Sequence, residues 1–281
     1  MKEQIKNIPL VDLHPFPGNP FSVREDAELQ DSIRDYGVIS PLVVRPLDSG
    51  GYEIISGHRR KAACEAAGME TVPAFVRELD DTAAVIALVD SNLHREHILP
   101  SERARAYKLK LDAIKRQGER TDLTSRQVGG RMESADIVGL EMNESGRQVQ
   151  RYIRLTELNP HILQMVDDGR IAINPAVELS FLPENEQVAL LETMESEDRT
   201  PSLSQSQRMR RLSAEGRLDM DAIFGIMTEE KPNQKEQIKL RTDNLRPFFP
   251  KGYSPQQMEQ TIMKLLADWQ RQRQQRSRGA R

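Results

Sequence analysis

Residues 54–63, with the sequence IISGHRRKAA, mark a point where an apolar strand ends at a glycine and an alanine-rich helix begins. The first N–H groups of a helix have no partner within the helix, so at such a junction they can bind an anion. Arg59, Arg60 and Lys61 add positive charge, and a side chain at Gly57 would keep a phosphate away from the backbone. The junction therefore predicts a phosphate site, and a solvated first helical turn is the alternative that this segment alone leaves open.

The stretches around this junction predict a small α+β domain. Apolar runs predict strands at residues 5–13, 42–44, 52–55 and 72–76, and helical spacing of apolar residues predicts helices at residues 26–36 and 58–68. From residue 80 to about residue 230 the pattern is mainly helical, with interruptions at prolines and glycines. A last helix is expected from residue 254, and its apolar stripe packs within the chain or against a second subunit. That stripe consists of Met258, Ile262, Leu265 and Trp269.

The composition argues against a membrane-spanning chain and against an exported, disulfide-rich one. Of the 281 residues 37% are hydrophobic and 30% are charged, and no apolar run approaches about 18 residues. The single cysteine, Cys64, has no partner for a disulfide within the chain, and its alanine neighbours favour a small packing residue. We therefore expect a cytoplasmic protein with no integral membrane association.

The net charge of −3 conceals a basic region between residues 94 and 131. This region has ten Lys and Arg against five acidic residues, a local excess of +5 that suits contacts with nucleic-acid phosphates. An ordinary charged helix face is the alternative.

Residues 134–158 have the pattern of a helix-turn-helix. One predicted helix stops at Met142 and Asn143, a second begins at residues 144–145, and Asn143 stands where such turns usually have glycine. The N-terminal side chains of the second helix would reach base edges in the major groove. We expect base contacts from Arg147 and Gln148, while two ordinary packed helices are the alternative. The full set of DNA-binding candidates is Arg126, Ser145, Arg147, Gln148, Gln150, Arg151 and Arg154, of which Arg151 and Arg154 are expected to meet phosphate or acids within the fold.

Four segments in order resemble the N-terminal domain of the ParB/Noc family of partition proteins. They are PGNP at residues 17–20 with Arg24, YGVISPLVVR at 36–45, GHRR at 57–60 and SNLHRE at 91–96. The resemblance implies a CTP-binding switch and a fold that is also similar to sulfiredoxin. The fold class expected for the whole chain is this α+β domain, then an all-α helix-turn-helix domain, then a small C-terminal unit.

The resemblance also implies the residues of a CTP site. The family's Gly-Glu-Arg-Arg signature is similar to residues 57–60, so that Arg59 and Arg60 would hold the triphosphate. The family's Glu-Asn-Leu-Gln-Arg signature is similar to residues 91–95, with Asn92 as the candidate Mg²⁺ ligand. Ser91 stands where the family has Glu, and a neutral hydroxyl is a poorer ligand for a hard cation, which leaves CTP hydrolysis open. The cofactor-binding candidates are Ser22, Arg24, Gly57, His58, Arg59, Arg60, Ser91, Asn92 and Arg95.

The resemblance continues through the helix-turn-helix and the helices behind it, to about residue 200. It implies a homodimer that reads a centromere-like site in double-stranded DNA, forms a CTP-dependent clamp on it, and works with a ParA-like Walker ATPase on the nucleoid or on a plasmid. The alternative is a transcriptional or replication regulator of a mobile element, with the same helix-turn-helix and a nucleotide domain that does not hydrolyse CTP. An enzyme of the sulfiredoxin or nuclease kind is a third reading, which the absence of a cysteine at the phosphate turn disfavours.

These observations give the expected domain organisation. Residues 1–98 form the nucleotide-binding domain and residues 99–200 the helical DNA-binding domain. Residues 201–237 form a linker region, because short apolar groups there alternate with Ser, Gln and charged residues. Residues 238–281 form a C-terminal unit, for which dimerisation is one of the two roles that its apolar stripe allows.

Overall fold

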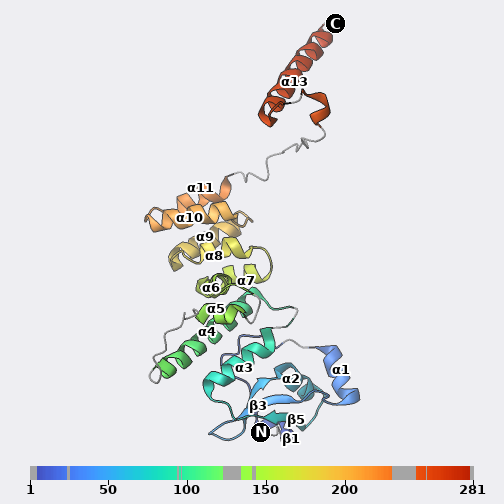
Figure 1. The fold of residues 1–281 in the computed structure, drawn as a ribbon, viewed down its shortest axis with the longest axis vertical. Coiled ribbons are helices and arrows are strands. Elements are labelled where there is room, and N and C mark those ends of the chain that lie inside the picture. The colour runs from blue at the N-terminus through green and yellow to red at the C-terminus, as the bar shows by residue number, and fades with distance from the viewer. Residues whose placement is uncertain are drawn as a thin grey trace. The chain divides into compact units, whose positions relative to one another are not determined.

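The computed structural model describes residues 5–23, 26–93, 95, 97–122, 134–140, 144–229, 245–250 and 252–278 (Figure 1). The chain divides into two compact units, residues 1–229 and residues 230–281. The finer division at residue 98 stays a prediction. Arg24, Arg126 and Asn143, which the sequence singles out, lie outside the described residues.

The first unit begins with a five-stranded sheet of order β1-β5-β3-β4-β2. β1 pairs with β5 and β3 with β4 in antiparallel fashion, whereas β3 pairs with β5 and β2 with β4 in parallel. The strands are β1 (Ile5–Pro9), β2 (Leu13–His14), β3 (Leu42–Pro46), β4 (Tyr52–Ser56) and β5 (Thr71–Val76). The single strand expected at residues 5–13 is therefore two strands, separated by the 3-10 turn η1 (Leu10–Asp12). Pro9 explains the break, because its nitrogen cannot donate to a ladder.

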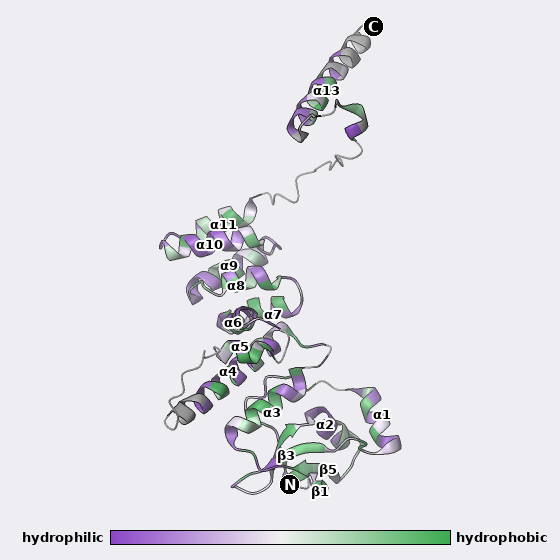
Figure 2. Ribbon diagram, viewed as in Figure 1, coloured by the Kyte–Doolittle hydropathy of each residue, from purple (hydrophilic) through white to green (hydrophobic). Residues whose placement is uncertain are grey.

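Two helices accompany the sheet, α1 (Ala27–Tyr36) and α2 (His58–Ala66). Alternate strand residues such as Leu42, Val44 and Ile54 are buried, and they pack with Ala63 and Cys64 of α2 in one apolar cluster. Figure 2 shows β3 as largely hydrophobic, as expected for a central strand covered on both faces. Cys64 is a free, fully buried thiol whose pKa is raised by burial, which confirms a packing residue.

The remaining elements of the first unit are helical, so the predicted succession of an α+β domain and an all-α region is confirmed. A single apolar cluster runs from Phe16 and Phe21 of the N-terminal loop through these helices to Met227. The helices are α3 (Asp81–Leu93), α4 (Pro100–Asp122), α5 (Ser134–Leu140), α6 (Gly146–Arg154), η2 (Leu155–Glu157), α7 (Pro160–Asp167), α8 (Ile173–Leu179), α9 (Glu184–Ser196), α10 (Leu203–Ala214) and α11 (Met220–Thr228).

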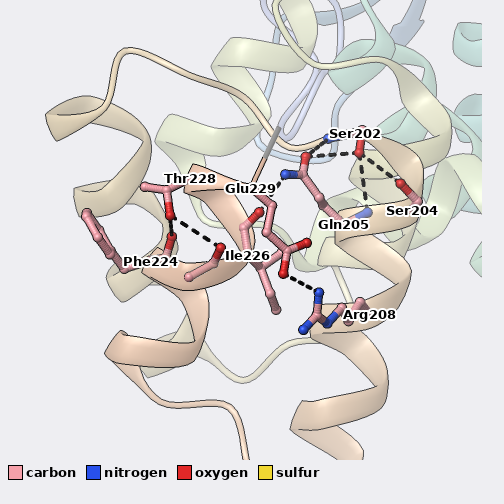
Figure 3. Close-up of polar contacts among 9 residues, drawn as sticks. Ser202, Ser204, Gln205, Arg208, Phe224, Ile226, Thr228 and Glu229 are labelled. Atoms are coloured by element: carbon pink, nitrogen blue, oxygen red, sulfur yellow. Dashed lines mark hydrogen bonds and ion pairs between the residues drawn. The ribbon is translucent and has the colours of Figure 1, made fainter. Parts of the chain in front are cut away.

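Much of the stretch that the sequence assigns to a linker is folded as α10 and α11. Ser202 forms a capping box with Gln205, and the Gln205 amide donates to the carbonyl of Ile226 at 2.6 Å (Figure 3). Arg208 pairs with Glu229 at 2.6 Å, which ties the two helices together again. Only a few widely spaced apolar residues are buried where α10 and α11 pack, which explains why the composition of this stretch alone indicates a linker. They are Met209, Ile223, Ile226 and Met227.

The second unit contains the 3-10 turn η4 (Arg246–Phe248) and the long helix α13 (Pro255–Arg278), as the sequence predicts from residue 254. Met258 is buried, whereas Leu265 is exposed. None of the helices in the described part of the chain combines the length and apolar character needed to cross a bilayer.

Candidate nucleotide-binding and DNA-binding sites

The predicted phosphate junction lies where β4 ends at Ser56 and α2 begins at His58. Gly57 is the N-cap residue, with φ 111° and ψ 19° in the left-handed region that favours glycine. A Cβ added to Gly57 would lie 2.6 Å from Cγ of Leu42 on β3. The glycine is thus required by its backbone conformation and by packing on the sheet. Access of a phosphate to the backbone, which the sequence suggests as the reason for this glycine, stays a prediction.

His58 is a neutral side chain in the first turn of α2. It is 8% exposed, and its Nε2 accepts a long hydrogen bond of 3.4 Å from the N–H of Phe16. Burial is the main cause that lowers the pKa of His58 to about 4, and the nearby charges of Arg95 and Lys61 contribute to this shift. An uncharged ring at this place allows several cations to stand close together.

Arg59 and Arg95 are two of those cations. Burial lowers the pKa of Arg95, and the positive charge of Arg59 adds to this effect while Glu102 opposes it. The Arg95 guanidinium lies over the ring of Phe21, 5.7 Å from its centroid. Arg59 forms an ion pair with Asp26, at the start of α1, through one Nη atom. Its Nε is buried and has no hydrogen-bond partner among the described residues.

Arg60 points to a different part of the domain. Its guanidinium donates to the carbonyls of Ser40 and Pro41, to the latter at 2.8 Å, and to the Ser40 hydroxyl at 3.2 Å. Burial lowers the pKa of Arg60. In this arrangement Arg60 fastens the turn before β3 to α2, apart from the contacts that Arg59 makes.

Ser22 contacts Glu102, a residue that the sequence does not single out. Its N–H and its hydroxyl both donate to Oε1 of Glu102, at 2.9 and 2.5 Å, and Oε2 of the same carboxylate accepts from the N–H of Leu99 at 3.2 Å. Glu102 is buried in the first turn of α4. Pro100 followed by an acid is a helix-start signal, but its partner, 80 residues earlier, cannot be read from it.

Ser91 and Asn92 bond within their own helix, α3. The Ser91 hydroxyl donates to the carbonyl of Leu88 at 3.0 Å, and the Asn92 amide donates to that carbonyl at 2.7 Å and to Ser91 Oγ at 3.1 Å. Asp90 points elsewhere and pairs with the buried Lys110 of α4. Nowhere in the described chain do three His, Cys, Asp or Glu side chains gather into a set that could hold a metal ion. Within that part of the chain there is therefore no built carboxylate site for Mg²⁺.

The structure thus brings together four of the predicted nucleotide-site residues. Ser22 lies in the loop before α1, and His58, Arg59 and Arg95 contact this loop at Phe16, Asp26 and Phe21, whereas Arg60, Ser91 and Asn92 form their hydrogen bonds elsewhere. A pocket of about 170 Å³ adjoins this group. Its lining is mainly apolar and consists of Pro15, Val23, Ile54, His58, Lys61, Ala62 and Glu65.

The second candidate site is the pair of short helices α5 and α6. They cross so closely that a Cβ on Gly139 would lie 2.4 Å from the carbonyl oxygen of Glu144, and one on Gly146 would lie 2.2 Å from Oδ1 of Asp136. The N–H of Glu144 donates to the carbonyl of Gly139 at 2.9 Å. The close crossing depends on Gly139 and Gly146. From the sequence, Asn143 is the residue expected to permit the tight turn.

The inner face of α6 is fixed against α4. Val149 and Tyr152 are buried, and the ring of Tyr152 meets that of Tyr107 edge to face at 5.8 Å. Glu144 accepts from the Tyr107 hydroxyl at 3.0 Å and pairs with Arg103 at 3.2 Å. Burial raises the pKa of Tyr107, so its hydroxyl stays a donor. The network holds the start of α6 in a fixed orientation.

The outer face of α6 presents polar side chains. Ser145 is the N-cap and accepts from the N–H of Gln148 at 3.2 Å, while Arg147 and Gln150 are exposed. Among the described residues Arg147 has no hydrogen-bond or ion-pair partner, and so it is available to a ligand. This is the half of the helix for which base contacts are expected.

The two last arginines of α6 contact the fold itself. Arg151 bonds to the Asn174 amide and to Gln148, and Arg154 donates to the carbonyl of Ser180 at 2.6 Å. The Arg154 guanidinium also lies 4.2 Å from the centroid of Phe181, and Arg210 of α10 lies 3.5 Å from the same centroid. Within the described residues no acid contacts Arg151 or Arg154, and the partners observed in the fold are amides, a carbonyl and an aromatic ring in place of the expected acids.

The basic excess of residues 94–131 is partly neutralised by the chain. Arg103, Lys108 and Lys110 pair with acids of the same unit, whereas Arg105 and Lys115 are exposed. Several charges in this region therefore tie α4 to α3, to η2 and to the turn before α6, while Arg105, Lys108, Lys115 and Arg116 are exposed to solvent.

Comparison with known proteins finds a matching family model and several similar proteins. The family model described as ParB N-terminal domain matches residues 1–93. The chain is 38% identical over 160 residues to a probable chromosome-partitioning protein ParB of Pseudomonas putida, and 33% identical over 195 residues to the chromosome-partitioning protein Spo0J of Thermus thermophilus. These alignments cover 57% and 68% of this chain, and 49% and 65% of the relatives. The chain thus spans about half to two thirds of the length of these curated relatives.

Two solved structures of C-terminally truncated ParB from Caulobacter crescentus are also similar. One, complexed to the centromeric parS site, has 23% identity and a TM-score of 0.45, and the match covers 73% of this chain and 98% of that one. The other, complexed with CTP-γ-S, has 26% identity and a TM-score of 0.31, and the match covers 68% and 98%.

Proposed function

Because the chain belongs to the ParB family of partition proteins, we propose that it binds a specific double-stranded DNA site and acts in chromosome or plasmid partition. The relatives are named for chromosome partitioning, and this chain matches the ParB N-terminal domain and continues into a helix pair suited to the major groove. The proposal places the reading of DNA in α6 and a nucleotide-dependent switch in the N-terminal domain.

The observation that carries the DNA-binding part is the contrast between the two faces of α6. One face is locked to α4 through Tyr152, Tyr107 and Glu144, and the other presents Arg147 and Gln150 to solvent. A rigid helix with an exposed arginine near its N-terminus suits a bidentate contact to a guanine edge. Ser145, as the N-cap, would add a phosphate contact through the helix N-terminus.

The test is selection of the preferred site from a random duplex library, followed by affinity measurements with variants. Arg147→Ala should weaken binding to the selected site by about tenfold to a hundredfold and relax preference at one base pair, in line with about 1–3 kcal/mol for a bidentate base contact. Arg217→Ala, which removes an exposed arginine paired with Glu215 outside α6, is the matched control. Equal loss of affinity on all sequences would make Arg147 a phosphate contact.

The second part of the proposal is CTP binding at the start of α2. The N–H groups after Gly57, with Arg59 and Arg95, would hold the phosphates, and the pocket beside His58 and Lys61 is the nearest room for the rest of the nucleotide. Mg²⁺ would arrive on the phosphates, since ions of this kind commonly bind through substrate oxygens and few protein ligands.

In the full proposal, nucleotide shifts a homodimer from an open form to a clamp around DNA. A ParA-like Walker ATPase is the proposed partner, and the nucleoid or a plasmid is the proposed location. Protein loaded with CTP at its DNA site should stay on a closed circular DNA after a high-salt wash and leave the same DNA once it is cut. Loss from both forms, together with intact specific binding, would favour the regulator of a mobile element over the partition clamp.

A further inference from the structure

We propose that Asp26 holds the phosphate-binding guanidinium of Arg59 in the nucleotide-free protein, and that an incoming nucleotide must displace this carboxylate to bind. The inference rests on the proposed CTP site and concerns its regulation. It makes Asp26 a built-in competitor that sets the nucleotide affinity of the domain.

Asp26 uses its two carboxylate oxygens for two separate tasks. Oδ1 accepts from the N–H of Leu29 at 3.1 Å and so caps the N-terminus of α1. Oδ2 forms the ion pair with Nη2 of Arg59 on α2. Because different oxygens carry the two interactions, the cap can persist when the ion pair is broken.

The Arg59 guanidinium is only partly used by this pairing. Its Nε is buried and has no partner among the described residues, and a buried donor without an acceptor is costly. The side chain is 41% exposed, so that solvent and solutes reach part of it. A phosphate can accept from Nε and an Nη together, which a carboxylate bound at one Nη does not do here. The guanidinium therefore has a donor without an acceptor in this state, which a phosphate oxygen would satisfy once the Asp26 carboxylate leaves.

Charge makes Asp26 and a phosphate mutually exclusive at Arg59. The neighbourhood contains the cations Arg59, Lys61 and Arg95, and the first two are each paired with a carboxylate, Asp26 and Glu65. Glu65 lies one helical turn from Lys61 on the surface of α2, whereas Asp26 comes from another element. An anion at Arg59 would meet the negative charge of Asp26 at hydrogen-bond range, so binding requires the carboxylate to leave.

The experiment compares nucleotide affinity of the full chain with and without the Asp26 charge. Asp26→Asn keeps an oxygen for the N-cap bond to Leu29, and asparagine is as good a cap as aspartate. We expect the dissociation constant for CTP with Mg²⁺, measured by calorimetry, to fall about threefold to tenfold. Asp31→Asn is the matched control, because Asp31 on the same helix pairs with Arg34 and is exposed. Its affinity should stay within twofold of the wild type.

A double-mutant cycle shows whether the effect passes through Arg59. With Arg59→Gln in the background, Asp26→Asn should neither restore nor tighten CTP binding, since no guanidinium remains to be contested. Inorganic triphosphate serves as a second probe, and the same tightening with it would place the competition at the phosphates. A thermal melt of each variant confirms that α1 and its domain remain folded.

Each outcome decides between the claims. Unchanged or weaker CTP binding by Asp26→Asn, or equal tightening by Asp31→Asn, would overturn the inference while leaving CTP binding established. If the wild type binds no CTP, the proposed function fails at its own test. In that case triphosphate binding gained by Asp26→Asn would still support the competition, and its absence would overturn that as well.

Discussion

The carboxylate of Glu102 accepts hydrogen bonds from both the N–H and the hydroxyl of Ser22, at 2.9 and 2.5 Å. This contact joins the loop before α1 to the first turn of α4, and Arg103 and Tyr107 further along α4 contact Glu144 just before α6. The candidate nucleotide loop and the helix that orients the proposed DNA-reading helix α6 are therefore linked by one buried side chain.

Removing that link should destabilise the first unit. Glu102→Ala leaves the N–H groups of Ser22 and Leu99 without their acceptor, and we expect a loss of about 2–4 kcal/mol in the free energy of unfolding, measured in urea. Glu28→Ala, which removes an exposed acid from the first turn of α1, should change stability by less than about 1 kcal/mol. Similar effects of the two changes would contradict the assigned role of Glu102.

His58 should make stability fall in mild acid. Its pKa is about 4 in the folded chain against 6.5 ordinarily, so the unfolded chain takes up the proton first as the pH decreases. Stability is complete above pH 6.5 and is lost between 6.5 and 4, by about 2 kcal/mol at pH 5. His58→Gln should remove this part of the acid sensitivity in urea titrations at pH 7, 6 and 5. Parallel curves for the two proteins would show that His58 is not buried as a neutral ring.

Two helical glycines should respond in opposite ways to alanine. Gly139→Ala places a methyl group against the backbone oxygen of Glu144, and we expect about 1–3 kcal/mol of destabilisation together with weaker DNA binding. Gly225 of α11 has open space around it, so Gly225→Ala should be neutral or stabilising by up to about 1 kcal/mol. Melting temperatures and DNA affinities of both variants check this pair, and equal behaviour would contradict the close crossing of α5 and α6.

Phe181 should stabilise the position of α6 through its contacts with Arg154 and Arg210. Its ring lies between the guanidinium groups of Arg154 on α6 and Arg210 on α10, each interaction being worth roughly 0.5–1 kcal/mol at an exposed site. Phe181→Leu should lower stability by about 1 kcal/mol and reduce affinity for the selected DNA site, whereas Phe181→Tyr should retain both. Phe224→Leu changes a similarly exposed ring on α11 and serves as the control. If Phe181→Leu changes neither the stability nor the DNA affinity, the contact between α10 and Phe181 does not stabilise α6.

The sequence predicts local structure here better than it predicts contacts. The turn at Gly57, the helix after it and the two helices around residue 143 follow from apolar spacing and helix-end residues, which are local. The partner of Ser22 lies 80 residues away, and the partner of Arg59 lies on another helix, so neither could be inferred from spacing. The sequence does not predict that residues 203–228 fold as two packed helices, because only a few buried side chains stabilise this pair and its composition is polar.

For the site residues too, the sequence predicts the element on which a residue lies better than it predicts what its side chain contacts. Arg147 and Gln150 could be placed on an exposed face from helical period alone, and the structure has them exposed. Arg60 and Asn92 lie in the expected elements, but their side chains bond to nearby carbonyls. A motif fixes where a side chain starts, while the surrounding packing decides where its polar atoms point.

The most direct test of the account is calorimetric titration of the purified protein with CTP and Mg²⁺, with ATP, GTP and UTP as controls. The account predicts saturable, selective binding of one CTP per chain, strengthened by Asp26→Asn and lost with Arg59→Ala. Absence of binding by any nucleotide, with and without the selected DNA, would contradict it and leave the N-terminal domain as a scaffold for the DNA reader.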